Sequence, residues 1–345
     1  MTAPRPNRQW IYRRRPIGAI DEGTYELVTT ELPGDLGRGE VIVAARYFSV
    51  DPYMRIQQAA RSTWEAPHPL GAVQGGAVVS RVVAVGPEVS AVAEGDWVIA
   101  YTGWQEHARC HVSQVTRLDP AVAPVTTALG ALGMPGRTAW FGLHEAGRPR
   151  PGDTLVVSGA AGAVGSIVVQ LGKRAGCRVI GIAGGPEKCR FVRDLGADVA
   201  IDYRPLGDDA AVIAAELARV TPGVDVYFDN VGGAITDAVI THLALRARVV
   251  ICGQVSQYDG GLDAPALGPR FLQHLLFQRA TITGVLARDF THRMDEYVRV
   301  AAPWVRDGSL IARETIVDGF ERLPSALAEM LRGKNVGKMI VRIAE

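Results

Sequence analysis

The glycine- and alanine-rich turn at residues 159–165 is the part of this 345-residue chain whose residue types point most directly to chemistry. The apolar run Thr154–Ser158 precedes it, and a segment of helical length, Val164–Ala175, follows it. Gly162 would let the backbone approach a phosphate, and Gly165 would let the helix pack close to the strand. The free N–H groups and the dipole at such a helix start favour negative charge. The pattern therefore predicts a pyrophosphate site of a dinucleotide rather than a purely structural turn, and its lining residues are Gly162, Ala163, Val164 and Gly165.

The tip of the next predicted strand, Arg178–Ala183, indicates which dinucleotide fits. In NAD-binding proteins an acidic residue at this tip accepts hydrogen bonds from the adenine ribose 2′-hydroxyl. Here the tip is Gly184-Gly185, and Lys188 follows within one helical turn. Because the glycines leave room and the lysine suits a 2′-phosphate, we expect NADP(H) rather than NAD(H), although Glu187 also lies nearby.

The chain lacks good zinc ligands at the positions where zinc dehydrogenases of a similar two-part layout have them. Zinc dehydrogenases of two-part layout place Cys and His ligands near the cleft between their parts. The corresponding positions hold Ser49-Val50-Asp51, Gln74 and Met134, and the nearby His107 and His111 fit surface or packing positions in a strand. We therefore expect no metal site, and hydride delivery to an already electrophilic carbon rather than metal-assisted alcohol oxidation.

Two kinds of pattern indicate the elements that position these residues. Short strands with Gly/Pro punctuation fill the first part, including 40–47, 77–85 and 97–100, and predict a partly open barrel. From about residue 125, apolar strands alternate with helix-length segments, which is typical of a doubly wound parallel sheet. The six predicted strands are Thr154–Ser158, Arg178–Ala183, Val199–Tyr203, Val224–Asn230, Arg248–Cys252 and Thr281–Leu286.

The same patterns divide the chain into three segments. We expect residues 1–124 to form a substrate domain, 125–305 a nucleotide-binding domain, and 306–345 a return segment that completes the first. The sixth strand, Thr281–Leu286, should lie at the sheet edge. Because an exposed apolar edge strand invites pairing with a second copy, we expect a homodimer.

Composition narrows the location and the partners. The net charge of +1 provides no basic field for nucleic acid. No run approaches the ~20 apolar residues of a membrane span, and the first residues lack the apolar core of a signal peptide. The four scattered cysteines have neither disulfide-framework nor zinc-ribbon spacing. We expect reduced thiols, a cytoplasmic location and a small-molecule substrate.

Several stretches, distributed over nearly the whole chain, resemble one family. They are Ser49–Arg55, Leu132–Gly136 with Thr138-Ala139, Gly159–Gly165, Glu187–Cys189, Phe228–Gly233, Cys252-Gly253 with Tyr258, and Gly333–Lys338. With them the chain resembles the zinc-independent medium-chain reductases that reduce activated alkenes with NADPH. That group includes leukotriene B4 dehydrogenase/prostaglandin reductases, plant double-bond reductases and bacterial curcumin reductases.

The resemblance implies a Rossmann doubly wound parallel sheet plus a β-rich, GroES-like, partly open barrel. It also implies roles at the cofactor. The implied residues are Gly184, Lys188 and Tyr203 at the adenosine phosphate, Asn230, Cys252, Gly253 and Tyr258 along the groove, Met134 beneath the nicotinamide, and Asn335 from the C-terminal tail. Two positions depart from the family pattern near the substrate space. Val285 stands where an aromatic residue often follows a glycine, and Trp64 stands where a loop tyrosine is often found.

The implied reaction is reduction of the carbon–carbon double bond of α,β-unsaturated ketones or aldehydes. The β-carbon of such a substrate accepts hydride, and negative charge then develops on the carbonyl oxygen as an enolate. Tyr258 or the cofactor ribose hydroxyl would stabilise that charge, and Tyr258 or water would protonate the α-carbon. Alternatively, Tyr258 only packs against the cofactor. Tyr53 would form a wall of the substrate site or donate to the carbonyl, or else be a core aromatic residue.

Two other functions fit the same sequence. A quinone oxidoreductase of this fold would share the cofactor site and differ in the pocket. A nucleotide-binding protein without turnover would keep the fold and lose the chemistry. Turnover of an enone and of a small quinone, measured side by side with NADPH oxidation, distinguishes the three.

Overall fold

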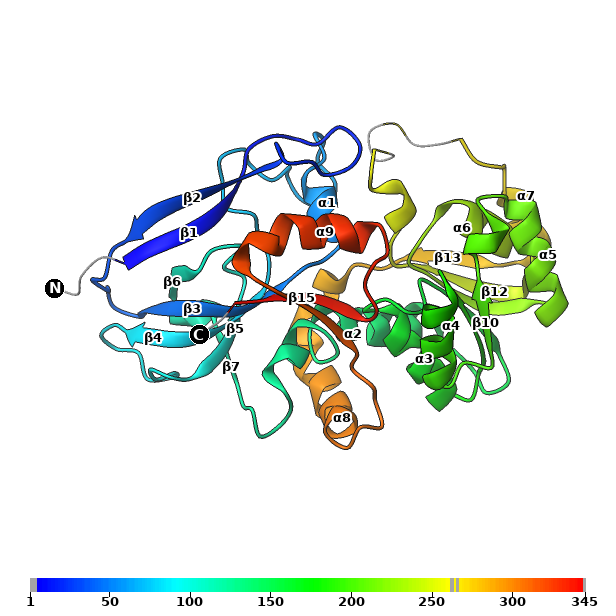
Figure 1. The fold of residues 1–345 in the computed structure, drawn as a ribbon. Helices are drawn as coiled ribbons and strands as arrows, with labels where there is room; N and C mark the ends of the chain where they lie inside the picture. Colours follow the sequence, from blue (N-terminus) through cyan, green and yellow to red (C-terminus); the bar gives the residue numbers. More distant parts are fainter. Residues whose placement is uncertain (1–4, 261–263, 265–266, 344–345) are drawn as a thin grey trace.

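The computed structural model describes residues 5–260, 264 and 267–343 and contains two large sheets with helices packed on them (Figure 1). One sheet has six parallel strands in the order β10-β9-β8-β11-β12-β13. These strands are β8 (Thr154–Ser158), β9 (Arg178–Ala183), β10 (Val199–Asp202), β11 (Val224–Asp229), β12 (Leu243–Ile251) and β13 (Thr281–Gly284). The predicted doubly wound parallel sheet is confirmed.

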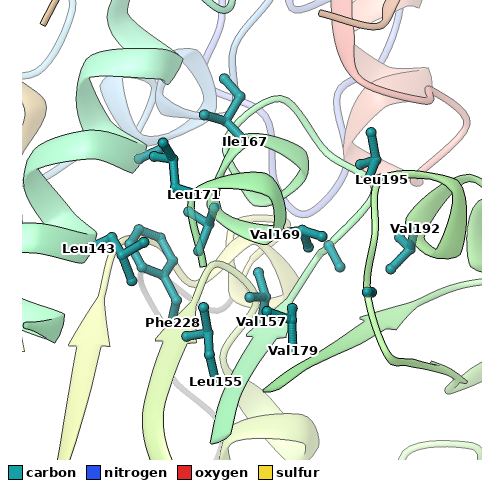
Figure 2. Packing of buried hydrophobic residues seen from close by; sticks show 14 of the residues in the cluster. Leu143, Leu155, Val157, Ile167, Val169, Leu171, Val179, Val192, Leu195 and Phe228 are labelled. Atoms are coloured by element: carbon teal, nitrogen blue, oxygen red, sulfur yellow. The ribbon is translucent and has the colours of Figure 1, made fainter. Parts of the chain in front are cut away.

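Helices connect these strands, and the core between them fixes where the phosphate-binding turn lies. The helices are α3 (Gly165–Arg174), α4 (Pro186–Asp194), α5 (Ala210–Val220), α6 (Gly233–Ile240) and α7 (Leu272–Gln278). Figure 2 shows Leu155 and Val157 of β8 packed with Ile167 and Leu171 of α3, and all four are buried. Because this apolar contact holds α3 along β8, the N-terminus of α3 lies at the carboxyl end of the sheet.

The other large sheet contains seven strands in the order β14-β15-β3-β4-β5-β7, with β6 also paired to β3. Its strands are β3 (Glu40–Ser49), β4 (Val78–Val85), β5 (Trp97–Ala100), β6 (His107–His111), β7 (Thr116–Leu118), β14 (Glu314–Asp318) and β15 (Lys338–Arg342). Strand β15 runs antiparallel to β3, so the C-terminal segment joins the N-terminal sheet. Helix α9 (Leu323–Leu331) packs in the same core.

The remaining elements include a strand pair that the sequence pattern does not predict. Strands β1 (Arg5–Tyr12) and β2 (Tyr25–Leu32) pair antiparallel. Most of their side chains are only partly buried, so neither strand has the continuous apolar run by which the other strands are recognised. Three helices complete this inventory: α1 (Tyr53–Gln57), α2 (Met134–Phe141) and α8 (Met294–Arg306). None of the helices in the described ranges has the length and apolar character needed to cross a membrane.

In the six-stranded sheet, two predicted strand boundaries differ from the structure by more than one residue. Strand β12 begins at Leu243 rather than Arg248, because Leu243 already pairs with Val224 before a register shift interrupts the ladder. Arg246 lies at this interruption with a φ of 62°. Because this charged residue interrupts the apolar pattern, the sequence does not indicate where the strand starts. Strand β13 ends at Gly284 rather than Leu286, and residues 287–293 form a 3₁₀-helix.

Asp229, at the carboxyl end of β11, holds several strand ends together. Its fully buried carboxylate accepts hydrogen bonds from the hydroxyls of Ser158 at 2.9 Å, Tyr227 at 2.9 Å and Thr236 at 2.6 Å. Two backbone N–H groups of the following turn also donate to it, each at 3.0 Å. These donors satisfy the hydrogen-bonding capacity of the buried carboxylate. Asp229 therefore ties β8, β11 and α6 together where the strands end.

We predict that Asp229→Ala lowers the free energy of unfolding by roughly 3 kcal/mol or more, because several buried donors lose their acceptor. Urea titration followed by circular dichroism measures the change. Asp225→Ala is the matched control on the same strand, since Asp225 accepts a hydrogen bond from the backbone of Thr154 at 2.8 Å. The control should cost roughly 1 kcal/mol. Equal losses in the two variants would contradict the role given to Asp229.

Candidate active site

The phosphate-binding turn lies at the carboxyl end of β8, where the sequence predicts it. Gly159 has a φ of +59°, and a Cβ on Gly165 would lie 2.3 Å from the Gly159 carbonyl oxygen. Only glycine at position 165 therefore lets α3 start so close to the strand. The Gly337 N–H donates to the Ala161 carbonyl at 2.7 Å, and Gly162 forms a bridge with Gly337. The C-terminal tail thus runs along the turn.

The residues predicted for the adenosine phosphate lie together beside the tip of β9. The ring of Tyr203 packs so closely on Gly184 that a Cβ there would lie 2.9 Å from the ring. Lys188 Nζ donates to the Gly333 carbonyl at 2.8 Å, which joins α4 to the C-terminal tail. Burial lowers the pKa of Lys188, and the charge of Arg204 lowers it further. Two cations close enough to repel each other favour an anion between them.

Two residues at this end of the site are missing from the sequence prediction. Arg204 follows Tyr203 directly, and its guanidinium lies near Gly185. Its position next to a predicted site tyrosine is the signal in the sequence that could have identified it. The Asp202 carboxylate accepts hydrogen bonds from the Gly185 N–H at 2.8 Å and the Arg204 N–H at 3.0 Å. Its charge is therefore engaged by backbone donors. The residues present fit a 2′-phosphorylated dinucleotide.

The ends of β12 and β13, with the segments that follow them, border an open groove of about 510 Å³. Four predicted residues line it, namely Cys252, Gly253, Tyr258 and Val285. The Cys252 and Gly253 N–H groups both donate to the Asp229 carbonyl, at 2.9 and 3.1 Å. Asn230 lies next to them, and its Nδ2 donates to the Ser158 carbonyl at 2.7 Å, so this amide also holds the end of β8.

Tyr258 is one of three titratable residues that line this groove, with Cys252 and Asp289. Its side chain is buried, and its hydroxyl oxygen accepts a hydrogen bond from the Gln254 N–H at 3.1 Å. Burial raises the pKa of Tyr258 to about 12. The hydroxyl therefore carries its proton at neutral pH, and an oxygen that already accepts one hydrogen bond can still donate its own proton.

Tyr53 begins α1, on the seven-stranded side of the molecule. Its hydroxyl lies 3.4 Å from that of Tyr101, which in turn accepts a hydrogen bond from Gln57 Nε2 at 3.2 Å. Burial raises the pKa of Tyr53 well above its usual range. Tyr101 is 57% exposed and is absent from the sequence prediction. Its position just after β5 carries no motif that would have marked it.

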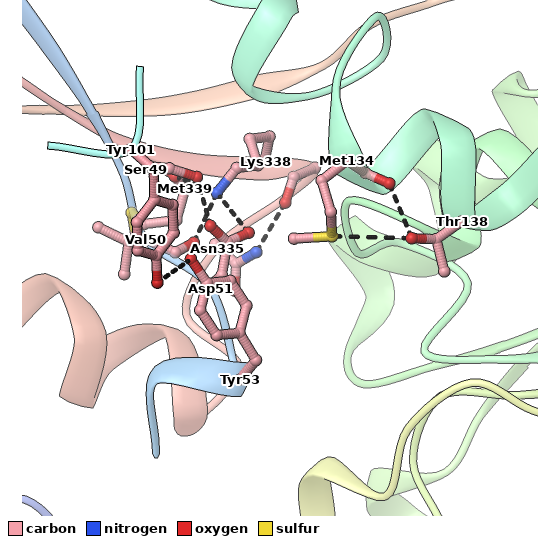
Figure 3. A network of polar contacts seen from close by, with 11 residues as sticks. Ser49, Val50, Asp51, Tyr53, Tyr101, Met134, Thr138, Asn335, Lys338 and Met339 are labelled. Carbon is pink, nitrogen blue, oxygen red and sulfur yellow. Dashed lines mark hydrogen bonds and ion pairs between the residues drawn. The ribbon is translucent and has the colours of Figure 1, made fainter. Parts of the chain in front are cut away.

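The positions where zinc ligands would stand hold a buried ion pair. Lys338 Nζ lies 3.0 Å from Asp51 Oδ1 and donates to the Val50 carbonyl at 2.6 Å, while Ser49 donates to Asp51 (Figure 3). Gln74 accepts a hydrogen bond from the Tyr25 hydroxyl. Across the described ranges, no three His, Cys, Asp or Glu side chains are grouped so that they could hold a metal ion.

Met134 and Asn335 complete the predicted set. In Figure 3, Met134 lies on one side of the tail that carries Lys338 and Asn335, and Tyr53 with Tyr101 lies on the other. Asn335 Nδ2 donates to the Gly337 carbonyl at 2.7 Å, and so it shapes the tail turn beside the phosphate-binding loop. The structure thus places most of the predicted residues in three groups, at the tips of β9 and β10, at the turn 159–165 and along the strand-end groove.

Comparison with known proteins places this arrangement in a family. Residues 8–118 match the family described as the N-terminal domain of oxidoreductase, and residues 163–302 match the one described as zinc-binding dehydrogenase. The second match does not include Ser49, Gln74 or Met134, the positions of the absent ligands. The NADPH-dependent curcumin reductase of Escherichia coli is 38% identical over 98% of this chain and 97% of its own length.

Two further relatives match over nearly their full length. Mouse prostaglandin reductase 1 is 38% identical over 97% of this chain and 98% of its own. The structure of CurA from Vibrio vulnificus in complex with NADPH has a TM-score of 0.88 and 39% identity, and covers 98% of this chain and 99% of its own. The fold and site therefore define a medium-chain dehydrogenase/reductase. Within that class, the chain belongs to the NADPH-dependent double-bond reductase family, with curcumin reductase and prostaglandin reductase 1.

We predict that Lys188→Ala weakens NADPH binding far more than NADH binding. Losing a charge-assisted contact to the 2′-phosphate costs about 1.5–3 kcal/mol, whereas NADH has no phosphate to lose. Fluorescence titration with each dinucleotide measures both dissociation constants. Lys173→Ala is the matched control, because Lys173 pairs instead with Asp198, which directly precedes β10. Equal weakening of both dinucleotides by Lys188→Ala would contradict the 2′-phosphate assignment.

Proposed function

We propose that this protein uses NADPH to reduce the carbon–carbon double bond of α,β-unsaturated ketones or aldehydes. The observation that carries this proposal is the side chain of Tyr258, which is buried and lines the strand-end groove with its hydroxyl group available as a donor. The relatives named for curcumin and prostaglandin reduction support the same reaction class. Parallel assays of NADPH oxidation with an enone and with a small quinone test it. Turnover of the quinone alone would overturn it.

The chain's own residues would hold the cofactor along the carboxyl ends of the strands. We assign the 2′-phosphate to Lys188 and Arg204 beside Tyr203, and the pyrophosphate to the Gly162–Gly165 turn at the start of α3. Met134, the Cys252-Gly253 turn and Asn335 on the tail would hold the nicotinamide end. When bound, NADPH supplies the hydride that reduces the double bond.

Tyr258 would then act on the substrate oxygen. As the β-carbon gains its hydride, the electron pair of the double bond shifts and negative charge develops on the carbonyl oxygen. A hydroxyl that donates a hydrogen bond to that oxygen stabilises the transition state more than the ground state. The α-carbon then takes a proton from Tyr258 or from water, which balances the reduction. Tyr53, with Tyr101 beside it, would form the opposite wall of the substrate site.

The organisation of the chain follows from these roles. We propose that residues 1–124 and 306–345 together bind the substrate, and that residues 125–305 bind the cofactor. The four cysteines are free thiols, which supports a reducing cytoplasmic setting.

We also propose a homodimer through β13, whose residues are exposed at the edge of the six-stranded sheet. The neighbouring α7 exposes Leu272, Leu276 and Phe277, which adds apolar area for a second copy.

We predict that Tyr258→Phe lowers kcat on an enone by roughly tenfold to a thousandfold, because the ring remains and only the donor is lost. The dissociation constant of NADPH should change little. Steady-state kinetics and fluorescence titration measure the two quantities. Because the pKa of Tyr258 is raised to about 12, the wild-type rate should show no loss from tyrosine ionisation below about pH 10. An unchanged kcat with a raised KM would make Tyr258 a binding residue, and the proton donor would then be water.

We predict a dimer mass for the wild type in light scattering at micromolar concentration. Ile282→Lys should shift the mass toward the monomer, because it places a charge in the centre of the edge strand. Ile316→Lys is the matched control, since Ile316 is 40% exposed on β14, the edge strand of the other sheet, and Ile282 is 37% exposed. A monomeric wild type, or equal dissociation of both variants, would contradict the interface.

A further inference from the structure

Arg55 is a buried cation in the helix that carries Tyr53. Only 3% of its side chain is exposed, although a guanidinium has five N–H donors to satisfy. Nη2 donates to the Gly18 carbonyl at 2.8 Å, and Nε has no hydrogen-bond acceptor. Burial of a charged group costs free energy unless an opposite charge is close. Arg55 therefore needs an anionic partner.

That partner comes from a distant part of the chain. Asp259 Oδ1 lies 3.5 Å from Arg55 Nε, and the side chain of Asp259 is 34% exposed. Asp259 follows Tyr258 directly, in the segment after β12. The turn that carries Tyr258 is fastened to the six-stranded sheet, because the Val255 and Ser256 N–H groups donate to the carbonyls of Asn230 and Val231.

The pair thus connects the two tyrosines through very short segments of chain. Arg55 stands two positions after Tyr53 in one helix, and Asp259 stands one position after Tyr258. Gly260 passes Gly18, whose carbonyl Arg55 already holds; a Cβ on Gly260 would lie 3.5 Å from the Gly18 Cα. The loop around Gly18, the helix α1 and the Tyr258 turn therefore meet at one guanidinium.

We propose that the Arg55–Asp259 ion pair is a positioning device that sets the separation between Tyr53 and Tyr258, and hence the place of the unsaturated substrate between them. This inference rests on the proposed function. Neither residue touches the reacting atoms; both act through the tyrosines beside them. Other contacts fasten the cofactor side at different places, since Lys188 holds Gly333 and Gly337 holds Ala161. Loss of the pair should therefore disturb the substrate and spare the cofactor.

The test begins with Asp259→Asn, which keeps the shape and removes the charge. We expect kcat/KM for an enone to fall roughly tenfold, because a small displacement of a positioning group has effects of this order or larger. The dissociation constant of NADPH should stay within about twofold of the wild type, as no contact to the assigned cofactor residues is lost. Asp259→Glu, which restores the carboxylate, should recover most of kcat/KM.

Arg55→Gln and the double variant Arg55→Gln/Asp259→Asn complete a cycle. If the two residues act as one pair, the double variant should lose little more kcat/KM than the worse single variant. Asp153→Asn is the matched control, because it breaks the mostly buried Arg248–Asp153 pair within the nucleotide-binding part. It should lower the melting temperature while leaving kcat/KM unchanged.

Hydrogen exchange gives a readout that needs no turnover. In Asp259→Asn, amides of both 53–57 and 255–260 should exchange faster, whereas Asp153→Asn should change neither segment. Three results would each overturn the proposed role of the ion pair. They are an unchanged kcat/KM in folded Asp259→Asn, additive losses of kcat/KM in the cycle, and faster exchange in residues 255–260 alone. A wild type without enone turnover would overturn the proposed function instead, and the exchange experiment would still decide on the pair.

Discussion

The buried ion pair between Lys338 and Asp51 joins the parts on which the site depends. Both side chains are nearly inaccessible to solvent, and burial lowers the pKa of Lys338 while Asp51 opposes that effect. Asp51 lies two positions before Tyr53, and Lys338 directly follows Gly337, which contacts the phosphate-binding turn. A buried pair of this kind adds little net stability, but removing one partner leaves an uncompensated charge. Its physical effect is to fix the tail and α1 relative to each other.

The six-stranded sheet meets that tail through its strand ends. Asp229 gathers donors from β8, β11 and α6 into one carboxylate, so the turns after these strands have little freedom. The Cys252 and Gly253 N–H groups attach the end of β12 to the same point through the Asp229 backbone. A rigid strand-end edge and a tail held from the other sheet are what a dinucleotide site requires, because hydride transfer depends on close positioning.

The sequence predicts best the features that local physics determines. Strands β8 and β9 have the predicted bounds, because each is an apolar run that is followed directly by glycine. The Gly162–Gly165 turn is recognisable for the same reason, since close backbone packing demands glycine at Gly165. The grouping of Lys188 with Tyr203 followed from family resemblance and from their positions after consecutive strands.

Features that depend on distant parts of the chain could not be predicted in this way. Strands β1 and β2 lack a continuous apolar run. Tyr101 reaches Tyr53 from another strand, and nothing in its own segment indicates this contact. Arg55 lies within a recognisable motif, yet its carboxylate partner stands about 200 positions later in the chain. Sequence reasoning thus identifies which side chains have chemistry, while the fold decides which of them meet.

The ion pair of Asp51, which stands at a position expected for a zinc ligand, also explains why tyrosines would stabilise the developing charge. Lys338 donates to Asp51 and to two backbone carbonyls. Its ammonium group therefore has partners within the protein already. Under the proposed function, stabilisation of an enolate oxygen would then be left to neutral hydroxyls. Burial raises the pKa values of Tyr53 and Tyr258, which keeps both protonated and able to donate. A neutral donor gains most from an acceptor that becomes charged only during the reaction, so it favours the transition state over the bound ketone.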